Sequence, residues 1–311
     1  MKKIFKLVSG NIVYPIVIAS LLILIILLVN LSNTIEHLSK AMIKRTISKT
    51  EAELSSFFNP VNTNIKVAVE RGKKGLYDSI KLQEFNKLFI PRIKNSSQIS
   101  SMMYGNTNGN EFMLLQLPDK WMNRITISGS SKNLPTEVFW KTNEIGTDSL
   151  IAIRIKDKTY DPRVRPWFQG ALSLQDEQYP HWTDPYTFFT TKDPGITVSA
   201  AWNDQDTPGL KKVIAFDVLL TDISKFTSHL EVTKNGMAFV LTKSMKILGL
   251  PKDVRFRNID SLKKYVLLNS LDIGIPALND ALINWQIQKD ESEYYSFKSN
   301  RNNWWGSIHR S

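Results

Sequence analysis

Residues 160–168, with the sequence YDPRVRPWF, bring together an aromatic hydroxyl, two arginines and an indole. The guanidinium group of an arginine such as Arg165 can hold a carboxylate through two parallel hydrogen bonds, and the indole N–H of Trp167 can donate a third. These residue types therefore suit carboxylate binding. They fit a structural role as well, in which Arg163 and Arg165 cap a helix or pair with surface acids and Trp167 is a core aromatic.

A second candidate group is Asp217, which lies within the otherwise apolar run 213–220. An unpaired charge in a buried strand is costly, so this pattern predicts a partner for the carboxylate. The residues leave open whether that partner is a bound ligand or Arg165.

The sequence contains no recognisable catalytic motif. The chain has no cysteine, which excludes disulfides, thiol nucleophiles and cysteine-based zinc sites. Gly-rich phosphate loops and the HExxH and GxSxG motifs are missing as well. Nothing in the spacing singles out a catalytic pair among the candidate carboxylates, which are Asp176, Glu177, Asp184, Asp193, Asp204 and Asp206. We therefore expect no enzyme activity, no metal and no cofactor.

The charge balance is basic, with 40 Lys+Arg against 29 Asp+Glu among 311 residues and a net charge of +11. Such a charge raises the possibility of nucleic-acid binding, because lysine and arginine gain affinity for phosphates by releasing counterions. The basic residues are scattered in pairs, such as Lys44-Arg45 and Lys211-Lys212, between neutral stretches. We therefore expect a solvated basic surface and no nucleic-acid partner.

The elements that must position these groups begin with an apolar segment. Residues 16–31 are almost purely Val, Ile, Leu and Ala, and about 20 such residues span a bilayer core. The sequence predicts a transmembrane helix over 12–31 after a cytoplasmic N-terminus, 1–11. The stretch is too long for a cleaved signal peptide, whose apolar part has about 7 to 15 residues. Lysines at positions 2, 3 and 6 place the N-terminus in the cytoplasm and the rest of the chain outside.

A long amphipathic helix is predicted next, over 32–72, because apolar residues recur at helical spacing from Ile35, Leu38 and Met42 onward. Asn59-Pro60 is expected to kink or interrupt it, since proline lacks a backbone donor. The helix is either a stalk packed on the domain or a signalling helix that joins the domain to the membrane.

Two hairpins organise the rest of the chain. The first pairs 99–104 with 111–117 around an Asn-Gly turn, and the second pairs 236–242 with 245–250. Between them we expect a helix with a polar cap at Thr221-Asp222. Further strands are predicted over 124–128, 150–155, 186–191, 196–202 and 212–220. The pattern indicates two α+β modules in series, over 73–220 and 221–311.

The order of these motifs carries a resemblance. The Asp-Pro-Arg-x-Arg-Pro-Trp segment at 161–167, the Asp-Pro-Tyr strand at 184–186 and the apolar strand 213–220 before a helix follow one another at a specific spacing. In this layout the chain resembles the double Cache (PDC-like) extracytoplasmic sensor domains of bacterial transmembrane signal-transduction proteins. The resemblance covers nearly everything from 31 to 311.

The resemblance implies an α+β fold with two stacked PAS-like modules, built on antiparallel sheets, on a long N-terminal helix. Module 73–220 would be membrane-distal and would hold the ligand, and module 221–311 would be membrane-proximal and C-terminally incomplete. It further implies a homodimer in the bacterial inner membrane with the sensor in the periplasm or outside the cell. A chemoreceptor, kinase, cyclase or phosphatase output would lie in the cytoplasm, so we expect the chain to be a fragment or a truncated protein.

The resemblance also implies roles for single residues. Arg165 and Trp167 match the pair that binds a ligand carboxylate, and Tyr160 matches an aromatic residue upstream of it. Asp217 matches the acid that pairs with a ligand ammonium group.

Three more residues complete the predicted site: Asp184 as a supporting acid, Tyr186 in the Asp-Pro-Tyr strand, and Phe168. The amino-acid binders of the family have tyrosine at the position of Phe168. The missing hydroxyl removes one hydrogen bond, worth about 0.5 to 1.5 kcal/mol. Carboxylates, amines and other small polar metabolites therefore stay open beside amino acids.

These inferences predict a membrane-anchored extracytoplasmic sensor that binds a small polar metabolite and signals to an output outside this chain. The alternative is an envelope-anchored structural or protein-interaction domain without a small-molecule ligand. Saturable binding that depends on Arg165 distinguishes the two.

Overall fold

A computed structural model describes residues 2–77, 81–129, 134–142, 148–156, 158–174, 180–288 and 294–308. The fold is α+β, as predicted, and the chain divides into two compact units. One unit combines Met1–Glu51 with Asp280–Ser311, and the other is Ala52–Asn279. The module boundary predicted between residues 220 and 221 falls inside the second unit, after the first residue of the helix Leu220–His229.

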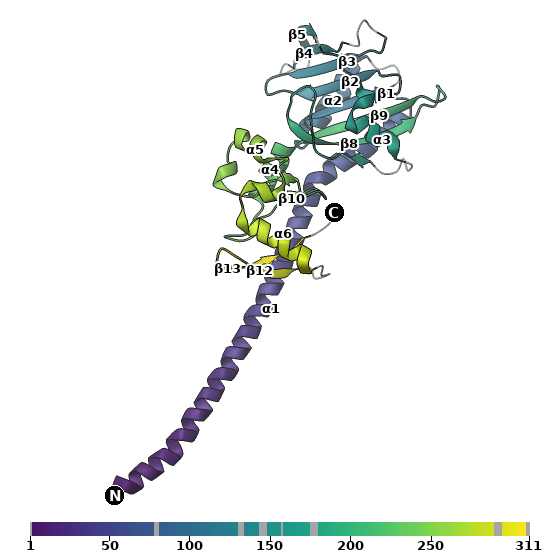
Figure 1. The fold of residues 1–311 in the computed structure, drawn as a ribbon. Helices are drawn as coiled ribbons and strands as arrows, with labels where there is room; N and C mark the ends of the chain where they lie inside the picture. The colour runs from purple at the N-terminus through teal and green to yellow at the C-terminus, as the bar shows by residue number, and fades with distance from the viewer. Residues whose placement is uncertain are drawn as a thin grey trace. The chain divides into compact units, whose positions relative to one another are not determined.

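The first element is one helix, α1 (Lys2–Lys73), of 72 residues (Figure 1). Its N-terminal part contains an 18-residue window with a mean hydropathy of 2.7, so it is long and apolar enough to cross a membrane. The same helix continues over the predicted stalk, 32–72, without a break.

The expected interruption at Asn59-Pro60 is wrong, because α1 runs through both residues. Proline removes one backbone hydrogen bond and crowds the preceding turn. Packing offsets this loss, since Phe57, Val61 and Ile65 are all buried on the face that the helix turns toward the domain. Tertiary contacts thus decide the conformation here.

Nine strands form one antiparallel sheet among the described residues, in the order β5-β4-β3-β2-β1-β9-β8-β6, with β7 paired to β8 (Figure 1). The first five are β1 (Ser101–Asn106), β2 (Glu111–Gln116), β3 (Trp121–Thr126), β4 (Thr136–Thr142) and β5 (Asp148–Ile155). The other four are β6 (His181–Trp182), β7 (Tyr186–Thr187), β8 (Pro194–Asn203) and β9 (Lys211–Leu219). The predicted hairpin around the Asn-Gly turn is confirmed as β1 and β2.

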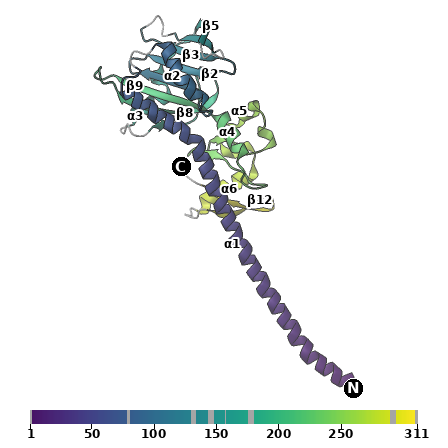
Figure 2. The same cartoon turned by 180° about the vertical axis from the view of Figure 1, so that it is seen from behind.

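The two faces of this sheet are covered by different helices. Asn86 of α2 (Leu82–Lys94) exchanges hydrogen bonds of 2.9 Å with Asn123 of β3, which places α2 on one face. On the other face, Ser199 of β8 donates to the carbonyl of Trp167 in α3 (Pro166–Ser173). Figure 2 shows α2 in front of the strands, next to the C-terminal end of α1. The sheet thus has α2 on one face and the short helix α3 on the other.

Smaller elements follow the sheet: α4 (Leu220–His229), the hairpin β10 (Val240–Leu241) and β11 (Ile247–Gly249), α5 (Ile259–Tyr265), α6 (Pro276–Gln288) and the hairpin β12 (Tyr295–Ser299) and β13 (Asn302–Gly306). The predicted second hairpin is confirmed in shortened form. The polar cap expected at Thr221-Asp222 is wrong, because α4 begins one residue earlier and Leu219 occupies the cap position. Three short 3-10 turns complete the described region: Pro162–Val164, Val254–Phe256 and Ser270–Ile273.

Candidate functional site

A cavity of about 350 Å³ opens on the α3 face of the sheet. Strands β1, β2, β3 and β9 form its floor, and the segments 160–167 and 186–193 form walls around it. Five of the predicted site residues line it: Tyr160, Arg165, Trp167, Tyr186 and Asp217. Residues far apart in the sequence therefore meet in one concave site of a size suited to a small metabolite.

Short-range sequence features hold the 160–167 segment in place. The Asp161 carboxylate accepts a 2.9 Å hydrogen bond from the backbone N–H of Arg163 and so caps a short 3-10 turn, Pro162–Val164. Pro166 then occupies the first turn of α3, where its fixed φ suits a helix start. The residue before a proline favours an extended backbone, and Arg165 has ψ 145°. Arg165 thus stands at the start of α3, beside the cavity.

The two arginines of this segment have different surroundings. Arg163 forms an exposed ion pair with Asp161, at 2.8 Å between Nη2 and Oδ2, and does not line the cavity. Arg165 does line it, is half-buried, and donates a 3.3 Å hydrogen bond to the carbonyl of Thr187. Its guanidinium carbon lies 5.5 Å from the ring centre of Tyr186. The structural role left open by the sequence fits Arg163, and Arg165 keeps a position suited to a ligand.

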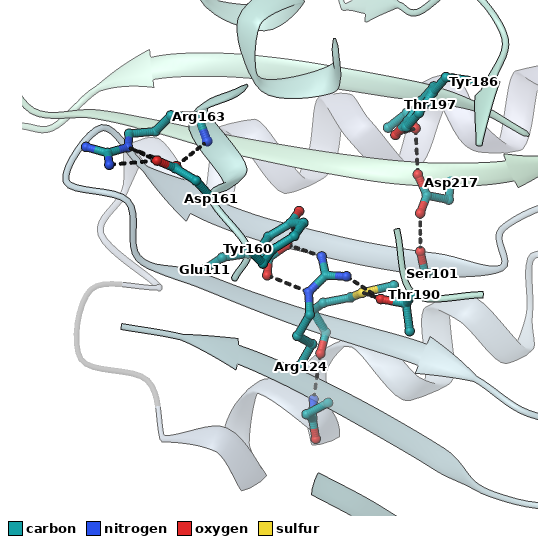
Figure 3. Close-up of polar contacts among 12 residues, drawn as sticks. Ser101, Glu111, Arg124, Tyr160, Asp161, Arg163, Tyr186, Thr190, Thr197 and Asp217 are labelled. Carbon is teal, nitrogen blue, oxygen red and sulfur yellow. Dashed lines mark hydrogen bonds and ion pairs between the residues drawn. The ribbon is translucent and has the colours of Figure 1, made fainter. Parts of the chain in front are cut away.

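Asp217 is the buried acid of the cavity, with 2% of its surface exposed. The hydroxyls of Ser101 and Thr197 each donate a 2.6 Å hydrogen bond to its carboxylate (Figure 3). Within the described part of the chain, no lysine or arginine forms an ion pair with it. Burial raises the pKa of Asp217 to about 6, although the two hydroxyls and the positive charge of Arg124 partly oppose this shift.

A chain of hydroxyl groups leads from this acid toward Arg165. Thr197 uses its single hydroxyl hydrogen on Asp217, so the 2.7 Å hydrogen bond between Tyr186 and Thr197 has the Tyr186 hydroxyl as its donor (Figure 3). The Tyr186 ring in turn lies against the Arg165 guanidinium. Arg165 and Asp217, the predicted cation and acid, are thus connected through Tyr186 and Thr197.

A buried ion pair between Arg124, which lines the cavity, and Glu111 was not predicted. Arg124 of β3 binds Glu111 of β2 with both Nε and Nη2, at 3.0 and 2.6 Å, and contacts the hydroxyl of Thr190 with Nη1. Its guanidinium carbon lies 3.9 Å from the ring centre of Tyr160, whose hydroxyl donates to Glu111. Burial alone would lower the pKa of Arg124, but the attraction of Glu111 outweighs it and raises that pKa. Tyr160 is therefore held by a charged network, with its hydroxyl directed at Glu111 (Figure 3).

Two predicted residues lie outside the cavity lining. Phe168 is 1% exposed and packs edge-on against Trp167 in the apolar cluster that supports the sheet. Asp184 is exposed. Burial lowers the pKa of nearby His181, and the charge of Asp184 opposes that effect. The structure therefore gives Phe168 a core position and Asp184 a surface position.

The carboxylates considered for catalysis do not form a pair in the cavity. Asp193 lines the rim, and Asp204 pairs with Lys212. Asp176 and Glu177 lie outside the described residues. Among the residues described, no group of three or more His, Asp and Glu side chains is placed to bind a metal ion.

The remaining lining is largely apolar. Met103, Met113 and Leu115 contribute the floor, and Phe188 and Leu219 contribute the sides. A floor of this kind can accept the aliphatic part of a small molecule, and Arg165 and Asp217 offer charged partners for polar groups. The cavity is therefore suited to a small molecule with both an apolar portion and separated polar groups.

Comparison with known proteins finds similar sequence in a chemotaxis protein and an adenylate cyclase. No family model matches the chain. The chain is 33% identical over 85 residues to the methyl-accepting chemotaxis protein McpB of Bacillus subtilis, which is 27% of this chain and 12% of that protein. It is 35% identical over 82 residues to adenylate cyclase 1 of Rhizobium meliloti, which is 26% of this chain and 11% of that protein. The matches thus span about a tenth of these longer relatives. They confirm the predicted resemblance to bacterial signal-transduction proteins.

Solved structures with a related arrangement are ligand-binding domains of chemoreceptors. The domain of Pseudomonas fluorescens CtaA in complex with L-leucine has a TM-score of 0.47 and 15% identity, with 85% of each chain covered. The domain of Pseudomonas aeruginosa PctB in complex with L-Gln has a TM-score of 0.44 and 18% identity, with 81% of this chain and 78% of that chain covered.

Proposed function

We propose that this protein is a membrane-anchored sensor whose cavity binds a small polar metabolite outside the cytoplasm. Asp217 carries this proposal. It is a buried carboxylate on the wall of a cavity, its hydrogen bonds come from neutral hydroxyls, and burial raises its pKa. Burying a carboxylate without an ion-pair partner costs stability, and a ligand ammonium group would supply the missing positive charge.

The opposite pole of the ligand would be a carboxylate bound by Arg165. The guanidinium of Arg165 keeps donors beyond the one that reaches Thr187, and it faces the same cavity as Asp217. Amino acids and related amine-bearing acids are therefore the ligand class that best fits both poles. The apolar floor supports an aliphatic or aromatic portion between them or beside them.

The sensor role is supported by chain continuity and by the relatives. Helix α1 includes the candidate membrane span and also contacts the sheet, where Trp182 of β6 packs edge-on against Phe58 and donates a 3.2 Å hydrogen bond to Asn62. The curated relatives are chemotaxis receptors and an adenylate cyclase, both of which are signalling proteins. On this proposal the sensor lies in the periplasm, acts as a homodimer, and biases a cytoplasmic output through α1 by shifting a conformational equilibrium.

The test is a thermal-shift screen of the full chain in lipid nanodiscs against amino acids, organic acids, amines and purines. A ligand present at about 100 times its Kd adds roughly 2.7 kcal/mol to the unfolding free energy. Arg165→Ala should abolish the shift. Arg163→Ala is the matched control, because Arg163 lies two residues away, is exposed and does not line the cavity.

The outcomes separate the candidate functions. A shift that is lost in Arg165→Ala and kept in Arg163→Ala supports the sensor. A well-folded protein that responds to no compound favours the structural or protein-interaction alternative. We also propose binding without turnover, so NMR of the bound compound should show it unchanged after prolonged incubation, and product formation would contradict this.

A further inference from the structure

One wall of the cavity comes from residues that follow the large sheet. Thr221, Asp222 and Lys225 of α4 line it, together with Ile259 and Lys263 of α5. Lys225 pairs with Asp222 within the same helix, at 2.9 Å. Lys263 instead reaches across to the sheet region, so it joins two parts of the cavity that are distant in sequence.

Lys263 contacts the turn 188–193, which forms one wall of the cavity. The N–H of Phe188 donates to the carbonyl of Asp193 at 2.9 Å, and the N–H of Lys192 donates back to the carbonyl of Phe188 at 3.1 Å. Lys192 takes the left-handed conformation, with φ 61°, that closes this compact turn. Phe188, Phe189, Thr190, Thr191 and Asp193 all line the cavity. A displacement of one end of this turn would therefore move most of one wall.

The inner side of the turn is attached to the charged network under the cavity. Thr190 accepts a hydrogen bond from Arg124, and the ring of Phe189 lies 4.8 Å from that of Tyr160. These contacts connect the turn to residues within the sheet region. They fix the turn from the side of the sheet.

The outer end of the turn is attached to α5. Lys263 Nζ lies 2.5 Å from Asp193 Oδ1, with the side chains 44% and 22% exposed. The helix that carries Lys263 is itself anchored at its start, where the Asn258 side chain accepts a 2.7 Å hydrogen bond from Ser261. The turn is thus held between the sheet and α5.

We propose that Lys263 is a positioning residue for the ligand cavity: its ion pair with Asp193 holds the 188–193 turn closed over the bound molecule. This inference rests on the proposed function in that the cavity is taken as the ligand site. Since Lys263 belongs to α5, ligand affinity depends on a helix outside the sheet. By linkage, a bound ligand that needs the closed turn must strengthen the contact with α5 in return.

The first test measures hydrogen exchange of the full chain in lipid nanodiscs without any ligand. Lys263→Gln should speed exchange at the Phe188 and Lys192 amides by about two- to five-fold, the range expected from a partly exposed ion pair. Lys264→Gln is the matched control, since Lys264 is the exposed neighbour on the same helix and does not line the cavity. Lys263→Arg, which keeps the charge, should exchange like the wild type.

A charge exchange adds a test of the pair itself. Asp193→Lys alone should speed exchange in the turn, and combining it with Lys263→Asp should restore much of the protection. Equal exchange in the wild type, Lys263→Gln and Lys264→Gln would overturn the proposal, as would a double variant no better than either single one.

A second test uses the twenty L-amino acids as probes in a thermal-shift panel, again with the full chain. A probe that binds the wild type should bind Lys263→Gln with a Kd about two- to five-fold higher. Unchanged binding in Lys263→Gln, with binding still lost in Arg165→Ala, refutes the positioning role and leaves the sensor function intact. If no probe binds any variant, the amino-acid proposal fails, and the exchange measurement still decides the role of Lys263.

Discussion

At the residue scale, the cavity is lined by two buried charged groups, Arg124 and Asp217, whose partners differ. Arg124 has a carboxylate partner at hydrogen-bonding distance, and Asp217 has neutral hydroxyl donors. The charge of Arg124 is neutralised by a protein carboxylate, while the negative charge of Asp217 has no ion-pair partner among the described residues. Stability and binding should therefore respond in opposite ways to the loss of the Asp217 charge.

Asp217→Asn should stabilise the ligand-free protein at pH 7.5, because it removes a charge that burial disfavours. A folded-state pKa of about 6, against about 3.9 in the unfolded chain, sets the gain at about 1 to 3 kcal/mol. The same change should abolish binding of amine-bearing ligands. Urea denaturation and the thermal-shift panel measure the two effects on one preparation.

The pH dependence of this difference has a defined sign. A raised folded-state pKa means that the stability linked to Asp217 is present below about pH 4 and is lost as the pH rises through about 6. The stability difference between Asp217→Asn and the wild type should therefore grow from pH 4 to pH 6 and level off above about pH 7. A constant difference over this range would show that Asp217 titrates normally.

Glu111→Gln should be strongly destabilising, since it leaves the Arg124 guanidinium buried without its counter-charge. Breaking a buried ion pair in this way typically costs about 3 to 5 kcal/mol. Asp161→Asn breaks the exposed pair with Arg163 instead and should cost less than about 1 kcal/mol. Equal losses in urea denaturation of the two variants would contradict the role given to the buried pair.

The sequence allowed part of this site to be predicted. Arg165, Trp167 and Asp217 stood out because of their chemistry and motif, and the structure places all three on the cavity. The pairing of Glu111 with Arg124 had one signal in the sequence, which is that they carry opposite charges in two successive predicted strands. Their contact depends on the register between these strands, which the sequence does not specify. Phe168 follows Trp167 on α3, but it is buried within the core cluster and does not line the cavity.

At the element scale, the C-terminal end of α1 depends on close approach to the sheet. A methyl group on Gly72 would lie 2.2 Å from the Trp202 ring, which is 2% exposed and cannot move into open space. Gly72→Ala should therefore cost about 1 to 3 kcal/mol despite the higher helix propensity of alanine. Thr63→Ala, at an exposed position of the same helix, is the control and should change stability little in urea denaturation.

Elements were predictable where local signals dominate. The Asn-Gly turn fixed the β1–β2 hairpin, and alternation and apolar runs indicated β8 and β9. The strand expected over 186–191 ends at Thr187, because the chain turns back at Lys192 and closes on Phe188. Helices α2, α3, α5 and α6 were missed, since each has 13 residues or fewer and is stabilised by packing on other elements.

At the scale of the whole molecule, α1 runs without a break from the candidate span to the cavity-bearing unit. Leu24→Arg places a charge within the most apolar part, at a cost of about 2.5 to 3.5 kcal/mol for insertion. We expect this variant to shift from the membrane pellet to the soluble or degraded fraction, while Leu24→Ala stays in the pellet. Membrane fractionation with immunodetection makes the comparison, and equal recovery would argue against a span.

The large-scale arrangement was the least accessible from sequence. The nine-stranded sheet, as far as the structure describes it, joins β1 to β9 across most of the region, and no local pattern specifies that pairing. The predicted second module contributes two short hairpins that the structure assigns to different compact units. Long-range contacts decide such features, and a single sequence carries no direct record of them.

The pairing of β1 with β9 also determines when the cavity can exist during synthesis. Ser101 and Asp217, which share a hydrogen bond, are 116 residues apart. A ribosome needs roughly ten seconds to add that many residues, at about 5 to 20 per second. Throughout that interval β1 lacks β9, one of its two neighbours in the sheet, while the apolar segment of α1 has already left the ribosome. On the proposed function, the apolar segment would meet the membrane before the sheet can form, and the strands already made would need protection until Leu219 has been translated.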